Sequence, residues 1–264
     1  MTVAAGKYTS PGLNKGIDIM RITTVWLAAV VLSASLSGCA TTSARENKSK
    51  AADYYAQLGA GYLQKNRLSL AKEYLEKALA SNRNSSDAQH YYAVLQDRLG
   101  NHAQAGTYFR KAMQSDGKNP ELLNNYGSHL CRHGRYEEAI AAFMAALNDP
   151  LYKTPEYAYT NAGICLQKHQ KGGQAEGYFR RALERNPSFP LALYQMAELE
   201  FARGENAKAQ AFLYRYNEQS QETAETLLLC YKINRALHEP EQAEKCATNL
   251  MARFPNSDEA KSLN

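Results

Sequence analysis

The chain has 264 residues, of which 44% are hydrophobic and 22% are charged, with a formal net charge of +5. This balance is typical of a folded globular protein and excludes a wholly disordered chain or a protein made of membrane spans. The basic residues are spread along the chain and form no basic run, so a nucleic-acid-binding protein is excluded as well. Helix-forming residues dominate while Gly and Pro are sparse, which favours an all-helical fold.

The first predicted element is a secretory signal peptide at residues 1–38. From Met20 the sequence reads "MRITTVWLAAVVLSASLSGCA", which combines a short positive end, an apolar core at residues 25–32 and small residues. The apolar core falls short of the roughly 18 residues of a membrane-spanning helix. We expect translation to start at Met20, since the preceding residues would make an unusually long positive segment.

The signal peptide ends in "LSGC", which resembles the bacterial lipobox. In such signals the cysteine receives a diacylglyceryl group, the chain is cut before it, and the new N-terminus is acylated. We therefore predict lipidation of Cys39, giving a multi-chain anchor; an ordinary signal peptide with an incidental cysteine is the alternative. Ala40 follows, and by analogy with sorting in Gram-negative bacteria this implies the outer membrane, facing the periplasm. Residues 39–50 are polar and aperiodic, which predicts a flexible tether.

From residue 51 to 264 the chain carries an internal repeat. Alanines recur at intervals of 34 residues in two sets, with a bulky residue four positions after most of them and a small residue twelve positions before. The alanines are Ala71, Ala105, Ala139, Ala175, Ala209 and Ala243. This pattern resembles the tetratricopeptide repeat, in which small residues let two antiparallel helices cross closely.

The resemblance implies an all-α, right-handed superhelical solenoid of six helix hairpins. The predicted repeats span 52–85, 86–119, 120–153, 156–189, 190–223 and 224–257, with Thr154 and Pro155 as a two-residue insertion. Gly100, Gly134 and Gly204 stand where the first helix of a hairpin must end. The sixth repeat matches least well, as expected of a capping repeat, and residues 258–264 extend that cap.

No motif in the sequence predicts catalysis. G-x-S-x-G, P-loop, G-x-G-x-x-G and Cys-x-x-Cys patterns are all missing, which disfavours a hydrolase on a lipid anchor. His129 and His133 have the i, i+4 spacing of a metal-binding pair, but no third ligand is evident in the sequence. We therefore predict a non-enzymatic, monomeric protein with no cofactor and no metal.

The cysteines beyond Cys39 fall into two pairs. Cys230 and Cys246 lie on facing helices of the sixth repeat, and a disulfide between them, permitted in the oxidising periplasm, would contribute about 3 kcal/mol. Cys131 and Cys165 lie on the first helices of adjacent repeats. We expect these two to be buried free thiols, with a second disulfide as the alternative.

Family geometry places the first helix of each repeat on a concave groove that suits an extended peptide. Asn125 and Asn161 match clamp asparagines of some peptide-binding arrays, but we favour hydrogen bonding between helices as their role. The predicted groove residues are Ala56, Ala60, Leu63, His90, Val94, Asp97, Asn124, Ser128, Arg132, Tyr157, Thr160, Ile164 and Lys168.

Residues 50–257 resemble one family more closely. The segments "NNYGSHLCRHGRYEEAIAAFMAALNDPLYKTPEYAYTNAGICL" and "YFRRALERNPSFPLALYQMAELEFARGENAKAQAFLYRY", with the "DPLY" turn, are similar to the type IV pilus biogenesis family PilF/PilW. The resemblance implies an outer-membrane pilotin that binds the secretin and assists its localisation and multimerisation. The alternatives are a scaffold of the β-barrel assembly machinery and a periplasmic protease adaptor, which share the anchor and the repeats.

Overall fold

The computed structural model describes residues 1–2, 45–169 and 172–263, and the signal-peptide core and Cys39 lie outside these residues. Residues 45–64 are helical. The helices that follow are α2 (Leu68–Ser81), α3 (Ser86–Arg98), α4 (His102–Asp116), α5 (Pro120–Arg132), α6 (Tyr136–Leu147), α7 (Pro155–Lys168), α8 (Gly172–Arg185), α9 (Pro190–Ala202), α10 (Asn206–Gln219), α11 (Ala224–Ala236), α12 (Pro240–Arg253) and α13 (Asp258–Lys261). The described part is therefore all-α, as predicted.

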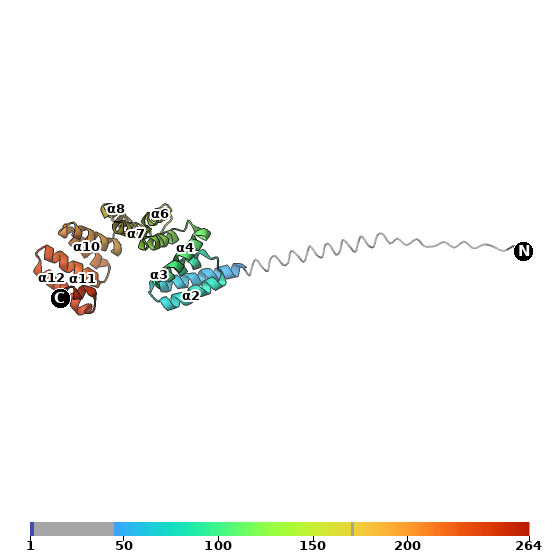
Figure 1. Ribbon diagram of the computed structural model, residues 1–264, viewed down its shortest axis with the longest axis horizontal. Helices are drawn as coiled ribbons and strands as arrows, with labels where there is room; N and C mark the ends of the chain where they lie inside the picture. The colour runs from blue at the N-terminus through green and yellow to red at the C-terminus, as the bar shows by residue number, and fades with distance from the viewer. Residues whose placement is uncertain (3–44, 170–171, 264) are drawn as a thin grey trace.

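The helices form consecutive antiparallel hairpins that stack into an arch, with α2 and α3 at one foot and α11 and α12 at the other (Figure 1). The first helices of successive hairpins touch one another, from α3 through α5, α7 and α9 to α11. Within the described residues, the second helices of successive hairpins make no such contacts. The first helices therefore line the inner, tighter face of a right-handed tetratricopeptide superhelix, and the second helices form its outer face.

Glycines let the two helices of a hairpin approach closely. A Cβ added at Gly127 would lie 2.7 Å from Cε1 of Phe143, and one at Gly163 would lie 2.4 Å from Cε1 of Phe179. Phe143 and Phe179 are fully buried. The bulky ring thus occupies the space that the missing side chain leaves, which is the physical reason for the repeat pattern.

The first helices of several hairpins end at the same position of the repeat, where the backbone has a positive φ. Gly100, Gly134 and Gly204 adopt φ values of 80°, 75° and 78°, the left-handed conformation predicted for them. Asn66 (φ 53°) and His238 (φ 59°) occupy the same position in the first and sixth repeats without being glycine. Asparagine and histidine are enriched among non-glycine residues that tolerate this conformation.

Two segments differ from expectation. Pro155 is the first residue of α7 and not part of an inserted loop, so the extra length lies in residues 148–154, where the Asp149 carboxylate accepts a hydrogen bond from the Leu151 amide (2.8 Å). Residues 45–50, expected within a flexible tether, are helical. Glu46 and Lys50 form an i, i+4 ion pair of 2.7 Å there, and such pairs support an exposed helix.

The array closes at α13. Ser257 caps this short helix by accepting a hydrogen bond from the Ala260 amide (3.1 Å), and Ala260 packs against Leu227 and Leu250. Residues 258–263 therefore extend the cap of the sixth repeat. None of the helices in the described ranges has the length and apolar character needed to cross a bilayer.

Two disulfides lie within the residues that the structure describes. Cys230 on α11 is joined to Cys246 on α12, the pair predicted from their facing helices, with a Cα–Cα distance of 6.0 Å. Cys131 on α5 is also joined to Cys165 on α7, with a Cα–Cα distance of 5.8 Å. Our expectation of free thiols at Cys131 and Cys165 is therefore corrected: the close stacking of neighbouring inner helices brings the two cysteines within bonding range.

Candidate functional site

A pocket of about 400 Å³ opens on the inner face between α3 and α5. It is lined by Val94, Asp97, Arg98, Phe109, Asn125, Ser128 and Arg132. Four of these residues, Val94, Asp97, Ser128 and Arg132, belong to the predicted groove. The pocket combines an apolar floor, two guanidinium groups, an amide and a hydroxyl, which suits a peptide carrying both apolar and acidic side chains.

Several predicted groove residues are buried and cannot present a surface to a partner. They are Ala56, Leu63, His90, Asn124 and Thr160, and Asp97 is buried as well, although it borders the pocket. The inner helices pack so closely that these side chains face a neighbouring helix. Ala60, Tyr157, Ile164 and Lys168 retain exposure but do not belong to the pocket between α3 and α5.

The buried polar residues of the inner face bond one repeat to the next. Asn125 Nδ2 donates a hydrogen bond to Nε2 of His90 (2.9 Å), and Asn161 Nδ2 donates one to Oδ1 of Asn124 (2.9 Å). Such partners are required because a buried polar group without one is costly. Asn125 and Asn161 thus have the inter-helix role favoured from the sequence, although Asn125 also borders the pocket.

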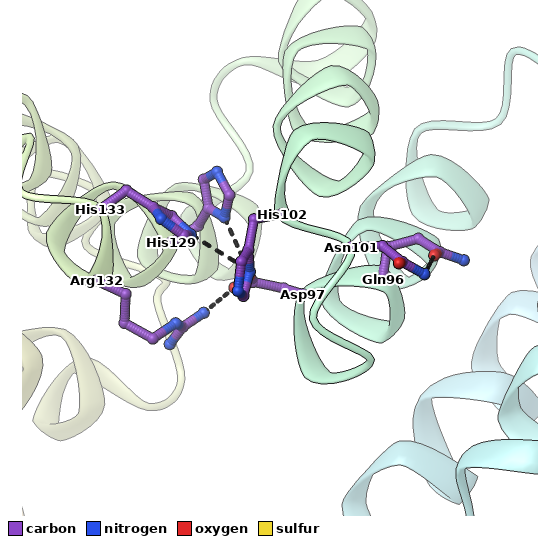
Figure 2. A network of polar contacts seen from close by, with 7 residues as sticks. All are labelled: Gln96, Asp97, Asn101, His102, His129, Arg132 and His133. Atoms are coloured by element: carbon purple, nitrogen blue, oxygen red, sulfur yellow. Dashed lines mark hydrogen bonds and ion pairs between the residues drawn. The ribbon is translucent and has the colours of Figure 1, made fainter.

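Asp97 is the centre of a polar network at the edge of this pocket (Figure 2). Its Oδ1 accepts hydrogen bonds from Nδ1 of His102 (2.9 Å) and Nδ1 of His129 (3.1 Å), and Nε2 of His133 lies 3.6 Å away. Arg132 forms an ion pair with its Oδ2. The network joins α3, α4 and α5.

Electrostatics keep Asp97 ionised despite its burial. Burial alone would raise the pKa of its carboxyl, but the hydrogen bonds from His129, Arg132 and His102 and the charge of Arg132 hold that pKa well below its usual value. His90 shows the opposite case: burial lowers its pKa to about 3, so its imidazole is neutral and accepts the Asn125 hydrogen bond.

A second part of the inner face, between α9, α11 and α13, was not predicted from the sequence. A pocket of about 320 Å³ there has three carboxylates, one amine and an apolar wall; its lining is Tyr194, Glu198, Phe201, Glu225, Leu228, Leu229, Lys232 and Glu259. A neighbouring pocket of about 350 Å³ shares Tyr194 and Glu225 and adds Leu191 and Tyr216. Extending the groove positions into the fifth and sixth repeats would have found Tyr194, Glu198, Glu225, Leu228 and Lys232.

The two pockets differ in charge. The pocket between α3 and α5 exposes Arg98 and Arg132, whose charges exceed that of Asp97. The pocket between α9, α11 and α13 carries Glu198, Glu225 and Glu259 against Lys232 alone. An extended segment bound along the arch would therefore meet a cationic site at one end and an anionic site at the other.

The fold and these inner-face pockets define a tetratricopeptide-repeat protein built to hold protein partners. Two tetratricopeptide-repeat family models match the chain, at residues 57–120 and 166–233. The chain belongs to the PilF/PilW family of type IV pilus tetratricopeptide-repeat proteins. It is 31% identical over 233 residues to the type IV pilus assembly protein PilF of Pseudomonas aeruginosa, covering 86% of this chain and 92% of that protein.

Solved structures agree with this assignment. The structure of P. aeruginosa PilF superposes with a TM-score of 0.71 at 31% identity, over 82% of this chain and 98% of the other. PilW, described as a widely conserved type IV pilus biogenesis factor, gives a TM-score of 0.71 at 32% identity, over 80% of this chain and 97% of PilW. The agreement extends over nearly the whole repeat array.

Proposed function

We propose that this protein is a lipid-anchored outer-membrane pilotin. In this role it binds the secretin of the type IV pilus in its inner groove and promotes the localisation and multimerisation of the secretin. The observation that carries the proposal is a charged and apolar inner face on a member of a type IV pilus biogenesis family.

The chemistry of the groove favours an extended segment of the partner. At the pocket between α3 and α5, Val94 offers apolar contact, while Arg98 and Arg132 suit a carboxylate. At the pocket between α9, α11 and α13, the aromatic and leucine side chains lie among three carboxylates, which suits a lysine or arginine flanked by apolar residues. A strand held in this way would have its edges covered until the ring closes, which protects it from aggregation.

Lipidation of Cys39 would fix the N-terminus in the membrane that receives the secretin. A short tether then raises the effective concentration of the groove near membrane-bound protomers. The two disulfides suit an oxidising compartment such as the periplasm.

The test is an immunoblot of secretin in isolated outer membranes from the wild type, a deletion of this gene and a Cys39→Ser strain. We expect the detergent-resistant secretin multimer to be lost in the deletion, and multimer or monomer to be mislocalised in Cys39→Ser. Normal multimers in all three strains would contradict the pilotin role and redirect attention to the barrel-assembly and protease-adaptor functions.

A further inference from the structure

We propose that Asp97, His129 and His133 form a binding site for a divalent transition-metal ion of the zinc class. The sequence supplies only the i, i+4 histidine pair. The fold adds the third ligand, because α3 packs beside α5 and brings the Asp97 carboxylate to the two imidazoles. The ligand atoms of Asp97, His129 and His133 lie within 4.8 Å of one another.

The distances from the Asp97 oxygen to the two imidazole nitrogens are close to those of a tetrahedral ion. Zinc bonds of about 2.0–2.1 Å to nitrogen and oxygen in a tetrahedron place the ligand atoms about 3.3 Å apart. Asp97 Oδ1 lies 3.1 Å from His129 Nδ1 and 3.6 Å from His133 Nε2, on either side of that spacing. The rings of His129 and His133 also lie close together, with a centroid separation of 4.6 Å and an interplanar angle of 55°.

The donor types select the ion class. Imidazole nitrogens with a carboxylate oxygen suit Zn²⁺, Ni²⁺ or Cu²⁺, whereas Mg²⁺ and Ca²⁺ prefer oxygen ligands. Each imidazole would bind through the nitrogen that faces Asp97 and keep its single proton on the other ring nitrogen.

The surroundings bear on the site in two ways. The charge of Arg132 repels a cation, but its guanidinium pairs with Oδ2 of Asp97 and leaves Oδ1 facing the imidazoles. Arg132 would therefore act as an outer partner that orients the Asp97 carboxylate to bind the ion through one oxygen. Asp97 lies in the last turn of α3, and His129 and His133 lie at the end of α5. The negative ends of both helix dipoles therefore point toward the site and favour a cation.

An ion in this place would tie α3 to the end of α5 at the edge of the pocket that Asp97 and Arg132 line. Metal binding would thus fix the second and third repeats relative to each other. This site requires no secretin and can be tested apart from the pilotin proposal.

The test uses the purified full chain, without a histidine tag and freed of metal by a chelator. Zn²⁺ is titrated by calorimetry and Co²⁺ by its visible absorption, which is intense for tetrahedral sites. His133→Gln removes a partly exposed ligand, and His238→Asn is the matched control, since His238 is exposed, lies far along the chain and has a φ that asparagine tolerates.

We expect equimolar Zn²⁺ binding in the wild type and in His238→Asn, and an affinity at least about tenfold weaker in His133→Gln, since even outer-shell losses cost 10–100-fold. Helical circular dichroism checks that His133→Gln is folded. A measurement that needs no variant is the ¹⁵N shift of imidazole nitrogens on Zn²⁺ addition: those of His129 and His133 should move and that of His238 should not. Absent Co²⁺ absorption, unchanged affinity in His133→Gln, or unmoved His129 and His133 nitrogens would overturn the proposal.

Discussion

The Asn125 side chain on α5 donates a 2.9 Å hydrogen bond to His90 on α3, an imidazole that is 1% exposed. The same face carries the bond from Asn161 to Asn124 and the disulfide between Cys131 and Cys165. Together these contacts join the inner helices of the second, third and fourth repeats. The inner face of this part of the arch is therefore held by directional bonds as well as by apolar packing.

The neutral state of His90 predicts a pH-dependent stability. Its folded pKa is about 3, below the unfolded value of about 6.5, so below pH 6.5 the unfolded chain gains a proton that the folded chain does not. The free energy of unfolding should fall as the pH drops from 6.5 toward 4.5, by up to about 1.4 kcal/mol per pH unit.

Urea unfolding at several pH values checks this expectation. His90→Gln should flatten the dependence in that window, while His238→Asn should keep the wild-type slope. A wild-type stability that is constant between pH 6.5 and 4.5 would show that His90 is not held neutral.

The close helix crossings predict the cost of a single methyl group. Gly127→Ala and Gly163→Ala would push a Cβ against Phe143 and Phe179, and overpacking of this kind costs about 1–3 kcal/mol. Gly177→Ala on α8 is the control, because a Cβ added there would meet nothing within 4 Å. At this position alanine should raise the free energy of unfolding by about 0.5–1 kcal/mol, since glycine destabilises a helix relative to alanine. Thermal unfolding followed by circular dichroism compares the three; equal effects at all sites would be inconsistent with the packing.

The two disulfides should differ in their contribution to stability. The Cys131–Cys165 bridge spans a sequence separation of 34 residues and the Cys230–Cys246 bridge one of 16. From the loss of loop entropy in the unfolded chain, we expect them to raise the free energy of unfolding by about 4 and about 3 kcal/mol, respectively. Serine pairs at each bridge, unfolded in urea without reductant, test this order. Full stability in the Cys131→Ser, Cys165→Ser double variant would argue that this bridge constrains nothing.

The repeat pattern predicted the fold because each of its positions has one dominant physical cause. Ala71 and its equivalents are small where helices cross, and Gly100 is a glycine where φ is positive. Asn66 and His238 take the same backbone conformation, but nothing in their identity requires it, so only the repeat register could have located them.

The site was harder to predict than the fold, because it depends on the rotation of each inner helix. A few tens of degrees decide whether a position such as His90 or Thr160 faces the groove or the adjacent helix, and both are buried. The approach of Asp97 to His129, 32 residues later, likewise depends on how α3 and α5 stack. Sequence spacing within one helix carries no information about that distance.

The groove predicts which surface the secretin contacts. Val94→Glu and Ser128→Glu place negative charge in the pocket between α3 and α5, next to its apolar floor. Leu63 and Asn124 are unsuitable for this purpose, since both are buried and a charge there would disturb folding. Met251→Glu is the matched control, because Met251 is 41% exposed on the outer helix α12.

The most direct measurement is the affinity of purified secretin for the full chain, compared among the wild type, Val94→Glu with Ser128→Glu, and Met251→Glu. Circular dichroism first establishes that all three are equally helical. We predict wild-type binding for Met251→Glu and at least about tenfold weaker binding for the groove variant, a loss of about 1.4 kcal/mol or more. Wild-type affinity in a folded groove variant would contradict the claim that the inner face holds the secretin.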